Sequence, residues 1–179
     1  MKGSHKEAHQ DYFLINGEII ATEKFNANDI TKTTTVYEVI RIINGIPLFV
    51  EEHLERLNKS IALLGFDLSL DEKDMEKQIY KLVEINQCYN YNIKLIVNSL
   101  DSGKPNIFLF YIESNYPEDT LYDKGIHTIL YEAERENPNA KVVLKDFRRK
   151  IDEARKAVHA YEAILVNQHQ HITEGSRSN

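Results

Sequence analysis

The stretch that decides the fold runs from residue 34 to residue 57 and reads TTVYEVIRIINGIPLFVEEHLERL. Alternating β-branched residues up to Ile43 predict a strand. Asn44-Gly45 then predicts a two-residue turn, because both residue types tolerate a positive φ. After the returning segment 46–50, apolar residues at spacings of 3, 4 and 3 predict an amphipathic helix; they are Leu54, Leu57, Ile61 and Leu64.

The same signals extend on both sides of this stretch. Asn16-Gly17 separates the strand-like segments 12–16 and 18–22, which predicts another hairpin. A second helix is expected after Ser69 or Asp71, and strands are expected at 93–97 and 107–112. Residues 12–116 therefore predict a small α+β domain that has an antiparallel sheet and two helices.

The rest of the chain predicts the first part of a second, α/β domain. Residues 117–124 are expected to form a connector, and residues 125–179 the domain segment. Its expected elements are a strand at 126–131, a helix at 143–159 and strands at 161–166 and 171–173. The 54 residues from Ile126 to Asn179 are few for an independent core, so we expect this domain to be incomplete.

The composition limits the functional classes. The 179 residues carry a formal net charge of −6, which disfavours nucleic acid as the main partner. One cysteine, Cys88, excludes an internal disulfide framework and suits a reducing compartment. Apolar runs stay well below the roughly 20 residues that span a bilayer, and the first ten residues lack the apolar core of a signal peptide. These features predict a cytoplasmic protein that binds neither membrane nor nucleic acid.

One candidate site lies in the deciding stretch itself. On a strand, Tyr37 and Arg41 share one face and Glu38 lies on the other, while His53 and Arg56 are neighbours on the helix. A guanidinium binds phosphate through two parallel hydrogen bonds, which makes Arg56 a candidate phosphate ligand. The alternative is an ordinary surface pair between Arg56 and a glutamate four residues earlier, Glu52.

Two further candidate sites lie nearer the C-terminus. Lys141 follows a turn-like segment and precedes an apolar run, where partial desolvation lowers the pKa of a lysine and favours a Schiff base. It could equally be a surface lysine, as could Lys145 and Lys150 beside it. In the segment 173–179, the Glu174 carboxylate could pair with a cationic ring nitrogen while backbone N–H groups approach a phosphate; the alternative is a polar turn.

Taken in order, these segments resemble a known family. Tyr-Glu-Val-Ile-Arg, Asn-Gly, Glu-His-Leu-Glu-Arg-Leu, a lysine, Tyr-Glu-Ala-Ile-Leu and Thr-Glu-Gly-Ser-Arg-Ser-Asn succeed one another between about Tyr12 and Asn179. The succession resembles the class IV aminotransferases, the fold-type IV pyridoxal phosphate enzymes. That family includes branched-chain and D-amino acid aminotransferases and aminodeoxychorismate lyase. The resemblance implies pyridoxal 5'-phosphate as cofactor and makes 125–179 the first part of the large cofactor-binding domain.

The resemblance also implies roles for single residues. Arg56 matches the arginine that grips the cofactor phosphate, and Glu174 matches the carboxylate that keeps the pyridine nitrogen protonated. Lys141 matches the catalytic lysine that forms the internal aldimine and shuttles the proton, because it precedes Tyr161 by 20 residues and Glu174 by 33. Lys145 is the alternative, with an interval to Glu174 that is four residues shorter.

Four more residues are assigned on the same basis. Tyr37 matches a tyrosine that lines the substrate pocket, and Arg41 joins it there because both side chains share one strand face. Ser176 and Arg177 are assigned to the cofactor, although some members have a serine at the position of Arg177. Several members carry an Arg-Gly pair after the strand matching 93–97, where this chain has Val-Asn-Ser-Leu at 97–100.

The implied activity is amino-group transfer between an amino acid, with branched-chain amino acids among the candidates, and a 2-oxo acid, by a homodimer. The alternatives are pyruvate elimination of the aminodeoxychorismate lyase type and a non-catalytic, C-terminally truncated fragment. His169 and His171 could place two imidazoles on one strand face, but a third metal ligand at a suitable spacing is missing from the sequence. We therefore expect no metal site.

Overall fold

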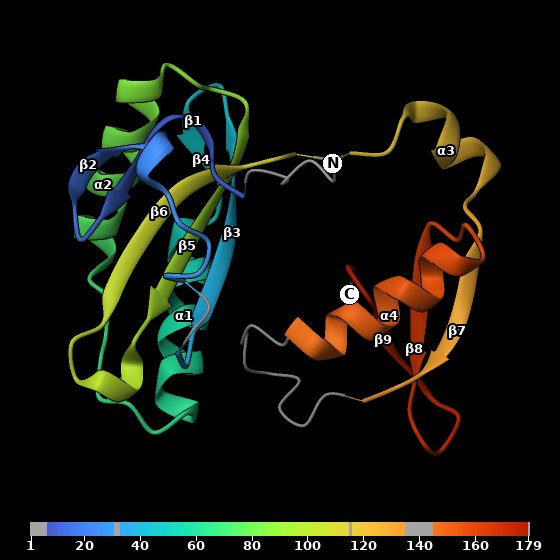
Figure 1. The fold of residues 1–179 in the computed structure, drawn as a ribbon. Coiled ribbons are helices and arrows are strands. Elements are labelled where there is room, and N and C mark those ends of the chain that lie inside the picture. Colours follow the sequence, from blue (N-terminus) through green and yellow to red (C-terminus); the bar gives the residue numbers. More distant parts are fainter. Residues whose placement is uncertain (1–6, 31–32, 115, 135–144, 179) are drawn as a thin grey trace. The chain divides into compact units, whose positions relative to one another are not determined.

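The described residues up to Ser114 fold around a six-stranded antiparallel sheet in the order β2-β1-β6-β5-β3-β4 (Figure 1). The computed structural model describes residues 7–30, 33–114, 116–134 and 145–178. The elements of this first unit are β1 (His9–Ile15), β2 (Glu18–Ala21), η1 (Thr22–Lys24), β3 (Val36–Ile43), β4 (Ile46–Pro47), α1 (Val50–Leu63), α2 (Glu72–Asn86), β5 (Tyr91–Asn98), η2 (Leu100–Ser102) and β6 (Asn106–Ile112).

Both predicted hairpins are confirmed, and their turns have the expected backbone. Asn16 and Gly17 have φ values of 50° and 80°, and Asn44 and Gly45 have 51° and 80°, so both pairs have the two positive φ values of a type I′ turn. The second hairpin differs from the expectation in one respect, because β4 has only two residues instead of a strand to residue 50. Phe49 adopts a left-handed conformation, φ 56°, and α1 begins directly after it.

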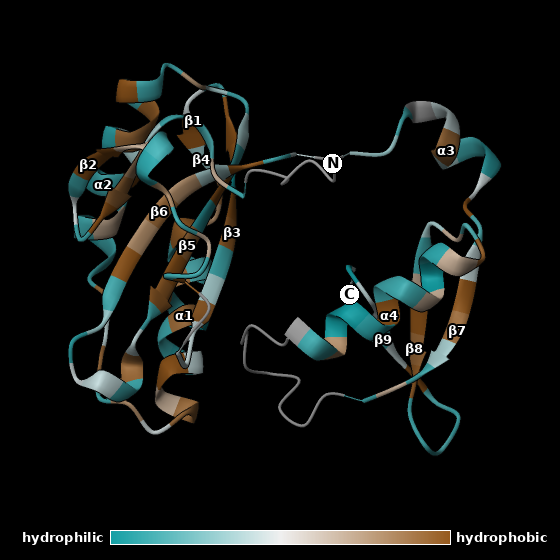
Figure 2. Ribbon diagram, in the orientation of Figure 1, coloured by the Kyte–Doolittle hydropathy of each residue, from teal (hydrophilic) through white to brown (hydrophobic). Residues whose placement is uncertain are grey.

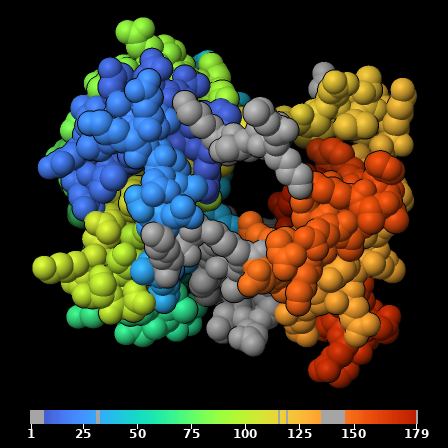
Figure 3. All heavy atoms as spheres, in the orientation of Figure 1, coloured from blue at the N-terminus to red at the C-terminus, as the bar shows by residue number. Residues whose placement is uncertain are grey.

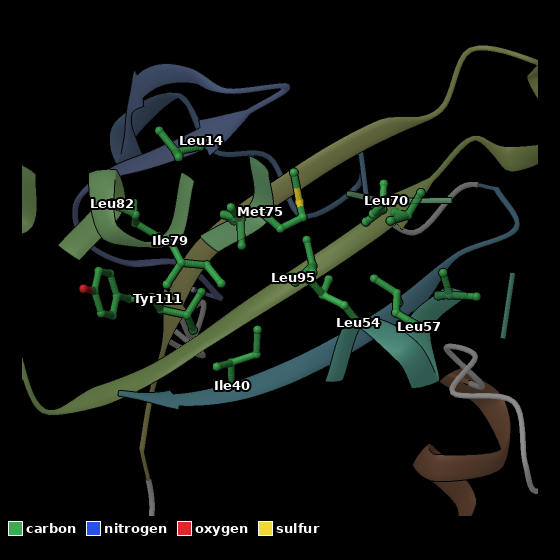
Figure 4. Close-up of a cluster of buried hydrophobic side chains, with 14 of the residues drawn as sticks. Leu14, Ile40, Leu54, Leu57, Leu70, Met75, Ile79, Leu82, Leu95 and Tyr111 are labelled. Carbon is green, nitrogen blue, oxygen red and sulfur yellow. The ribbon is translucent and has the colours of Figure 1, made fainter. Parts of the chain in front are cut away.

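The two helices pack on one face of the sheet and bury the main core (Figure 4). Helix α1 faces β3, and α2 faces β1 and β6. Helix α2 starts where the sequence predicts, since the Asp71 carboxylate caps it by accepting from the Asp74 N–H at 2.9 Å. The core residues labelled in Figure 4 come from both helices, four strands and the segment before α2; they are Leu14, Ile40, Leu54, Leu57, Leu70, Met75, Ile79, Leu82, Leu95 and Tyr111.

The opposite face of this sheet has a smaller apolar cluster. Tyr37 packs there with Ile96 and Phe110, and residues of the segment after β2, including Phe25 and Ile30, cover them. Figure 3 shows this segment, in lighter blue, on the surface of the first unit. The sheet is therefore buried on both faces, and successive residues of β3 enter two different environments.

The second unit comprises residues 116–134 and 145–178 and contains a three-stranded sheet in the order β7-β8-β9. Its elements are α3 (Asp119–Lys124), β7 (Thr128–Glu132), α4 (Lys145–Ala157), β8 (Glu162–Val166) and β9 (Ile172–Gly175). β7 and β8 are parallel, β8 and β9 antiparallel. This βαβ arrangement confirms the predicted α/β character, whereas the expected connector 117–124 contains the short helix α3.

Helix α4 attaches to this sheet through a narrow apolar stripe. Phe147 and Ile151 pack against Ala163 and Leu165 of β8. The remaining surface of the helix is hydrophilic, as its teal colour in Figure 2 shows. Among the described residues, no helix has the length and apolar character needed to cross a membrane.

Candidate functional site

A buried carboxylate in the first unit binds the predicted phosphate ligand, Arg56, and its helical neighbour His53. Glu38 lies on β3 with a fully buried side chain, 0% exposed. Arg56 of α1 donates to it from Nε to Oε1 at 2.7 Å and from Nη2 to Oε2 at 2.5 Å. His53, one helical turn earlier, places Nδ1 2.8 Å from Oε2. The strand and the helix predicted from the sequence thus meet in one polar cluster, Glu38–His53–Arg56.

The hydrogen-bonding capacity of these groups fixes their roles. An ionised carboxylate only accepts, so His53 Nδ1 must carry the proton that it shares with Glu38. Arg56 Nη2 lies 3.2 Å from this Nδ1, but both atoms are then donors, and both are directed to the carboxylate. Hydrogen bonding to Glu38 raises the pKa of Arg56 above its ordinary value, although partial burial acts in the opposite direction.

Arg56 keeps part of its guanidinium accessible. Its side chain is 44% exposed although Glu38 is fully buried. In the part of the chain that the structure describes, its hydrogen bonds to Glu38 use Nε and Nη2, and Nη1 has no partner there. The alternative pair with Glu52 does not form among the described residues. A solvated pair of that kind occurs instead between Lys59 and Glu55, at 2.5 Å.

The other face of β3 carries the two residues assigned to the substrate pocket. Tyr37 and Arg41 lie on the sheet face opposite Glu38, as predicted, and Tyr37 is 6% exposed. Lys94 on β5, which was not predicted from the sequence, pairs with Val39, the residue between Tyr37 and Arg41 on β3. Lys94 Nζ lies 5.4 Å from the centre of the Tyr37 ring and 2.9 Å from the Glu7 carboxylate. Lys94 therefore places a positive charge beside Tyr37, although this chain lacks the arginine that several family members carry after the strand corresponding to β5.

In the second unit a second carboxylate organises the end of the described chain. Glu162 of β8 is mostly buried and accepts from the Ser176 hydroxyl and from the N–H groups of Ala163 at 2.7 Å and Arg177 at 3.3 Å. The Ser178 hydroxyl lies 3.3 Å from Oε2, the oxygen that also accepts from the Arg177 N–H. Burial by itself would raise the pKa of Glu162, but these hydrogen bonds and the charge of Arg177 lower it below its ordinary value.

Two of the predicted cofactor residues therefore turn toward Glu162. Ser176 donates its hydroxyl hydrogen to the carboxylate, and the Arg177 guanidinium lies 3.9 Å from it and 5.0 Å from the centre of the Tyr161 ring. Glu174 lies on β9 opposite Leu165 and is half-buried. The Gly175 N–H donates to the Ser178 carbonyl at 2.8 Å, and a Cβ at Gly175 would collide with the Ser178 side chain.

The remaining candidates give a mixed result. Lys141 lies outside the described residues, and so does the side chain of Lys145. His169 and His171 are exposed in the β8–β9 connection with ring centres 6.3 Å apart. Within the described ranges they have no third histidine, cysteine, aspartate or glutamate close enough to complete a metal site.

The burial of Glu38 and Glu162 could have been predicted from the sequence. Each is an ionisable residue within a strand whose neighbours on the same face are apolar, Ile40 in one case and Ile164 in the other. A carboxylate in such a stripe must find hydrogen-bond donors when the strand is buried. The pattern predicts a buried acceptor, although it does not identify the donors.

Known proteins match this chain over most of its length. The family model described as "Amino-transferase class IV" matches residues 35–179. A D-alanine aminotransferase from Bacillus licheniformis is 34% identical over 158 residues, which cover 80% of this chain and 54% of that protein. The chain thus spans about half the length of this relative.

Solved structures show the same fold at low sequence identity. The branched-chain amino acid aminotransferase from Escherichia coli superposes with a TM-score of 0.77 at 18% identity, over 94% of this chain and 63% of that chain. The branched-chain aminotransferase from Thermoproteus uzoniensis, with norvaline, gives 0.74 at 17% identity, over 94% and 63%. With the family model matching most of the chain, the protein belongs to the class IV aminotransferase family, whose members use pyridoxal phosphate.

Proposed function

We propose that this chain binds pyridoxal 5'-phosphate and takes part in amino-group transfer between an amino acid and a 2-oxo acid. The observation that carries the proposal is the Glu38–His53–Arg56 cluster, which presents a fixed, partly exposed guanidinium on Arg56, the residue that the resemblance matches to the cofactor's phosphate ligand. Family membership supports pyridoxal phosphate as the cofactor, and the cluster supports Arg56 as the ligand of its phosphate group.

The described residues fit a phosphorylated cofactor. A phosphate binds strongly to donors that are charged at neutral pH and that are not consumed by other partners. Arg56 meets both conditions, because its pKa is raised and its Nη1 remains without a partner among the described residues. Glu174 supplies a carboxylate for a protonated ring nitrogen, and it lies on a strand next to the turn that Glu162 stabilises.

The chain's own residues then have distinct tasks. When bound, the cofactor supplies an electron sink for the charge that develops at the substrate Cα. Arg56 would bind the phosphate, and Glu174 would hold the proton on the ring nitrogen. The Lys141 amine would attach the cofactor and move a proton to and from the substrate Cα. Tyr37 would line the substrate side, with Arg41 on the same strand face as the cation for a substrate carboxylate; Lys94 lies beside Tyr37 but is paired with Glu7.

Sequence similarity favours a D-amino acid as substrate. The Bacillus licheniformis relative at 34% identity is a D-alanine aminotransferase, whereas the two branched-chain enzymes lie below 20% identity and share the fold alone. We therefore propose a small D-amino acid ahead of a branched-chain one. We also propose that two copies associate and that the protein is cytoplasmic, as the resemblance and the single cysteine suggest.

An amino-transfer assay tests this proposal. The chain, supplied with pyridoxal phosphate and a 2-oxo acid acceptor, is expected to convert D-alanine to pyruvate faster than it consumes L-leucine. Lys141→Ala should abolish the reaction and the covalent attachment of the cofactor. Retained attachment in that variant would contradict the assignment of Lys141. Pyruvate release from aminodeoxychorismate without an amino acceptor would instead support the lyase.

A further inference from the structure

We infer that Glu38 is a positioning residue, which aims the guanidinium of Arg56 at the cofactor phosphate. The inference rests on the proposed function, since it names the residue that prepares the phosphate ligand. Glu38 itself is fully buried and is not expected to touch the phosphate. Its effect is transmitted through the two hydrogen bonds that it accepts from Arg56.

The burial of Glu38 indicates that its charge serves a specific arrangement. It lies on the helix-facing side of β3 with Val36, Ile40 and Ile42, all of them buried apolar residues. An ionised carboxylate in such surroundings is costly unless donors compensate it, and an apolar side chain of similar size would often be at least as stable there. Core packing alone therefore does not account for a glutamate at this position.

The geometry fixes the direction of the guanidinium. Arginine carries its donors in a planar fork, so bonds from Nε and Nη2 to the two oxygens of one carboxylate define the plane and leave Nη1 on the far side. The remaining donors then face away from the buried carboxylate, on a side chain that is 44% exposed. A ligand phosphate would meet a cation whose orientation is already set, so less side-chain entropy is lost on binding.

His53 supports the carboxylate from a second side. Its Nδ1–H lies 2.8 Å from Oε2, the same oxygen that accepts from Arg56 Nη2. The Glu38 carboxylate is therefore held by side chains from two successive turns of α1, which restricts its rotation. The three side chains therefore hold one another in place, and Arg56 is the one that reaches the surface.

Two effects of Glu38 on phosphate binding have opposite signs, so an experiment can separate them. As a negative charge beside Arg56, Glu38 weakens the attraction for phosphate, and its neutralisation would tighten binding. As an orienting group it strengthens binding, and its replacement would weaken it. In Glu38→Gln the side-chain amide NH₂ replaces one of the two acceptor oxygens and would face an Arg56 donor in either orientation, so the fork is broken while the size of the side chain is kept.

The test compares two ligands that differ only in the phosphate, pyridoxine 5'-phosphate and pyridoxine. Neither has an aldehyde, so neither forms an imine with surface lysines. The ratio of their dissociation constants for the 179-residue chain, measured by calorimetry, reports the phosphate contribution alone. Loss of general structural integrity would weaken both ligands, whereas loss of the phosphate grip changes the ratio.

We expect the wild-type chain to prefer the phosphorylated ligand and Glu38→Gln to lose about tenfold or more of that preference. Glu55→Gln is the matched control, because Glu55 lies on the solvated side of α1 and pairs with Lys59; its ratio should stay within about twofold of the wild type, as expected for an exposed pair. Arg56→Lys keeps a positive charge without the fork and should also lose the preference. If Glu38→Gln does not fold, a phosphate preference that survives in Arg56→Lys still overturns the inference.

The outcomes distinguish the inference from the function beneath it. A wild-type preference that Glu38→Gln retains or increases would overturn the positioning role and leave Arg56 as the phosphate ligand. A preference that survives in Arg56→Lys would likewise overturn it, since a point charge would then suffice. A wild-type chain without any preference would reject Arg56 as the phosphate ligand, and the inference with it.

Discussion

Replacing Glu162 by glutamine should loosen the turn that follows Glu174. The carboxylate accepts from the Ser176 hydroxyl, the Ala163 and Arg177 N–H groups and the Ser178 hydroxyl. Hydrogen bonds to charged groups are worth about 1.5–3 kcal/mol each, and those at 3.3 Å fall at the weak end. Glutamine keeps one acceptor oxygen but turns an NH₂ group toward the donors on the other side. We therefore expect a loss of about 2–4 kcal/mol in the local stability of this turn.

Amide hydrogen exchange measures this change at the residues concerned. The N–H groups of Gly175 and Ser176 bond at 2.8 Å to the carbonyls of Ser178 and Ala163, so their exchange reports opening of the turn. A loss of 2–4 kcal/mol corresponds to roughly 30-fold to 1,000-fold faster exchange, up to the limit set by global unfolding. Glu153→Gln is the control, because Glu153 is exposed and pairs only at the surface with Arg149 among the described residues. Equal exchange in the two variants would refute the reasoning.

Three further predictions follow from the packing and the charges. Leu57→Ala, at a fully buried core position, should cost about 2–5 kcal/mol in urea unfolding, and a loss below about 1 kcal/mol would contradict its place in the core. Because folding lowers the pKa of Glu162, its charge stabilises the fold at pH values above its ordinary pKa of 4.5, and this stabilisation is lost as the pH falls through the lowered pKa. The difference in unfolding free energy between wild type and Glu162→Gln should therefore shrink in an acid titration. Gly175→Ala should lower the melting temperature and the exchange protection of the turn, because the added Cβ would collide with Ser178; unchanged values would show that the turn adapts freely.

Local signals in the sequence predicted much of the fold. The Asn-Gly pairs specify their turns through backbone preference alone, and the leucine spacing of α1 specifies its buried side, so neither depends on distant residues. The short β4 was predicted too long, because the left-handed conformation of Phe49 was not foreseen from an ordinary apolar run. Helix α3 was missed because its six residues carry too little periodicity.

The sequence predicted which residues belong to the candidate site better than it predicted which of them contact one another. The strand faces of Tyr37 and Glu38 follow from a period of two and could be predicted. The partner of Arg56 could not be predicted. Glu52 lies four residues before Arg56 on the same helix, whereas Glu38 lies 18 residues before it, and only the packing of α1 on β3 brings Glu38 to Arg56. Lys94 was missed for the same reason, since its place beside Tyr37 depends on the β3–β5 register.

The most direct test of the central claim is to find where the cofactor attaches. The purified chain is incubated with pyridoxal phosphate, reduced with borohydride and digested, and the labelled peptides are mapped by mass spectrometry. We expect one dominant adduct, on Lys141, and we expect inorganic phosphate to abolish it by competing at the Arg56 cluster. Labelling scattered over many lysines, or concentrated on Lys145, would contradict it.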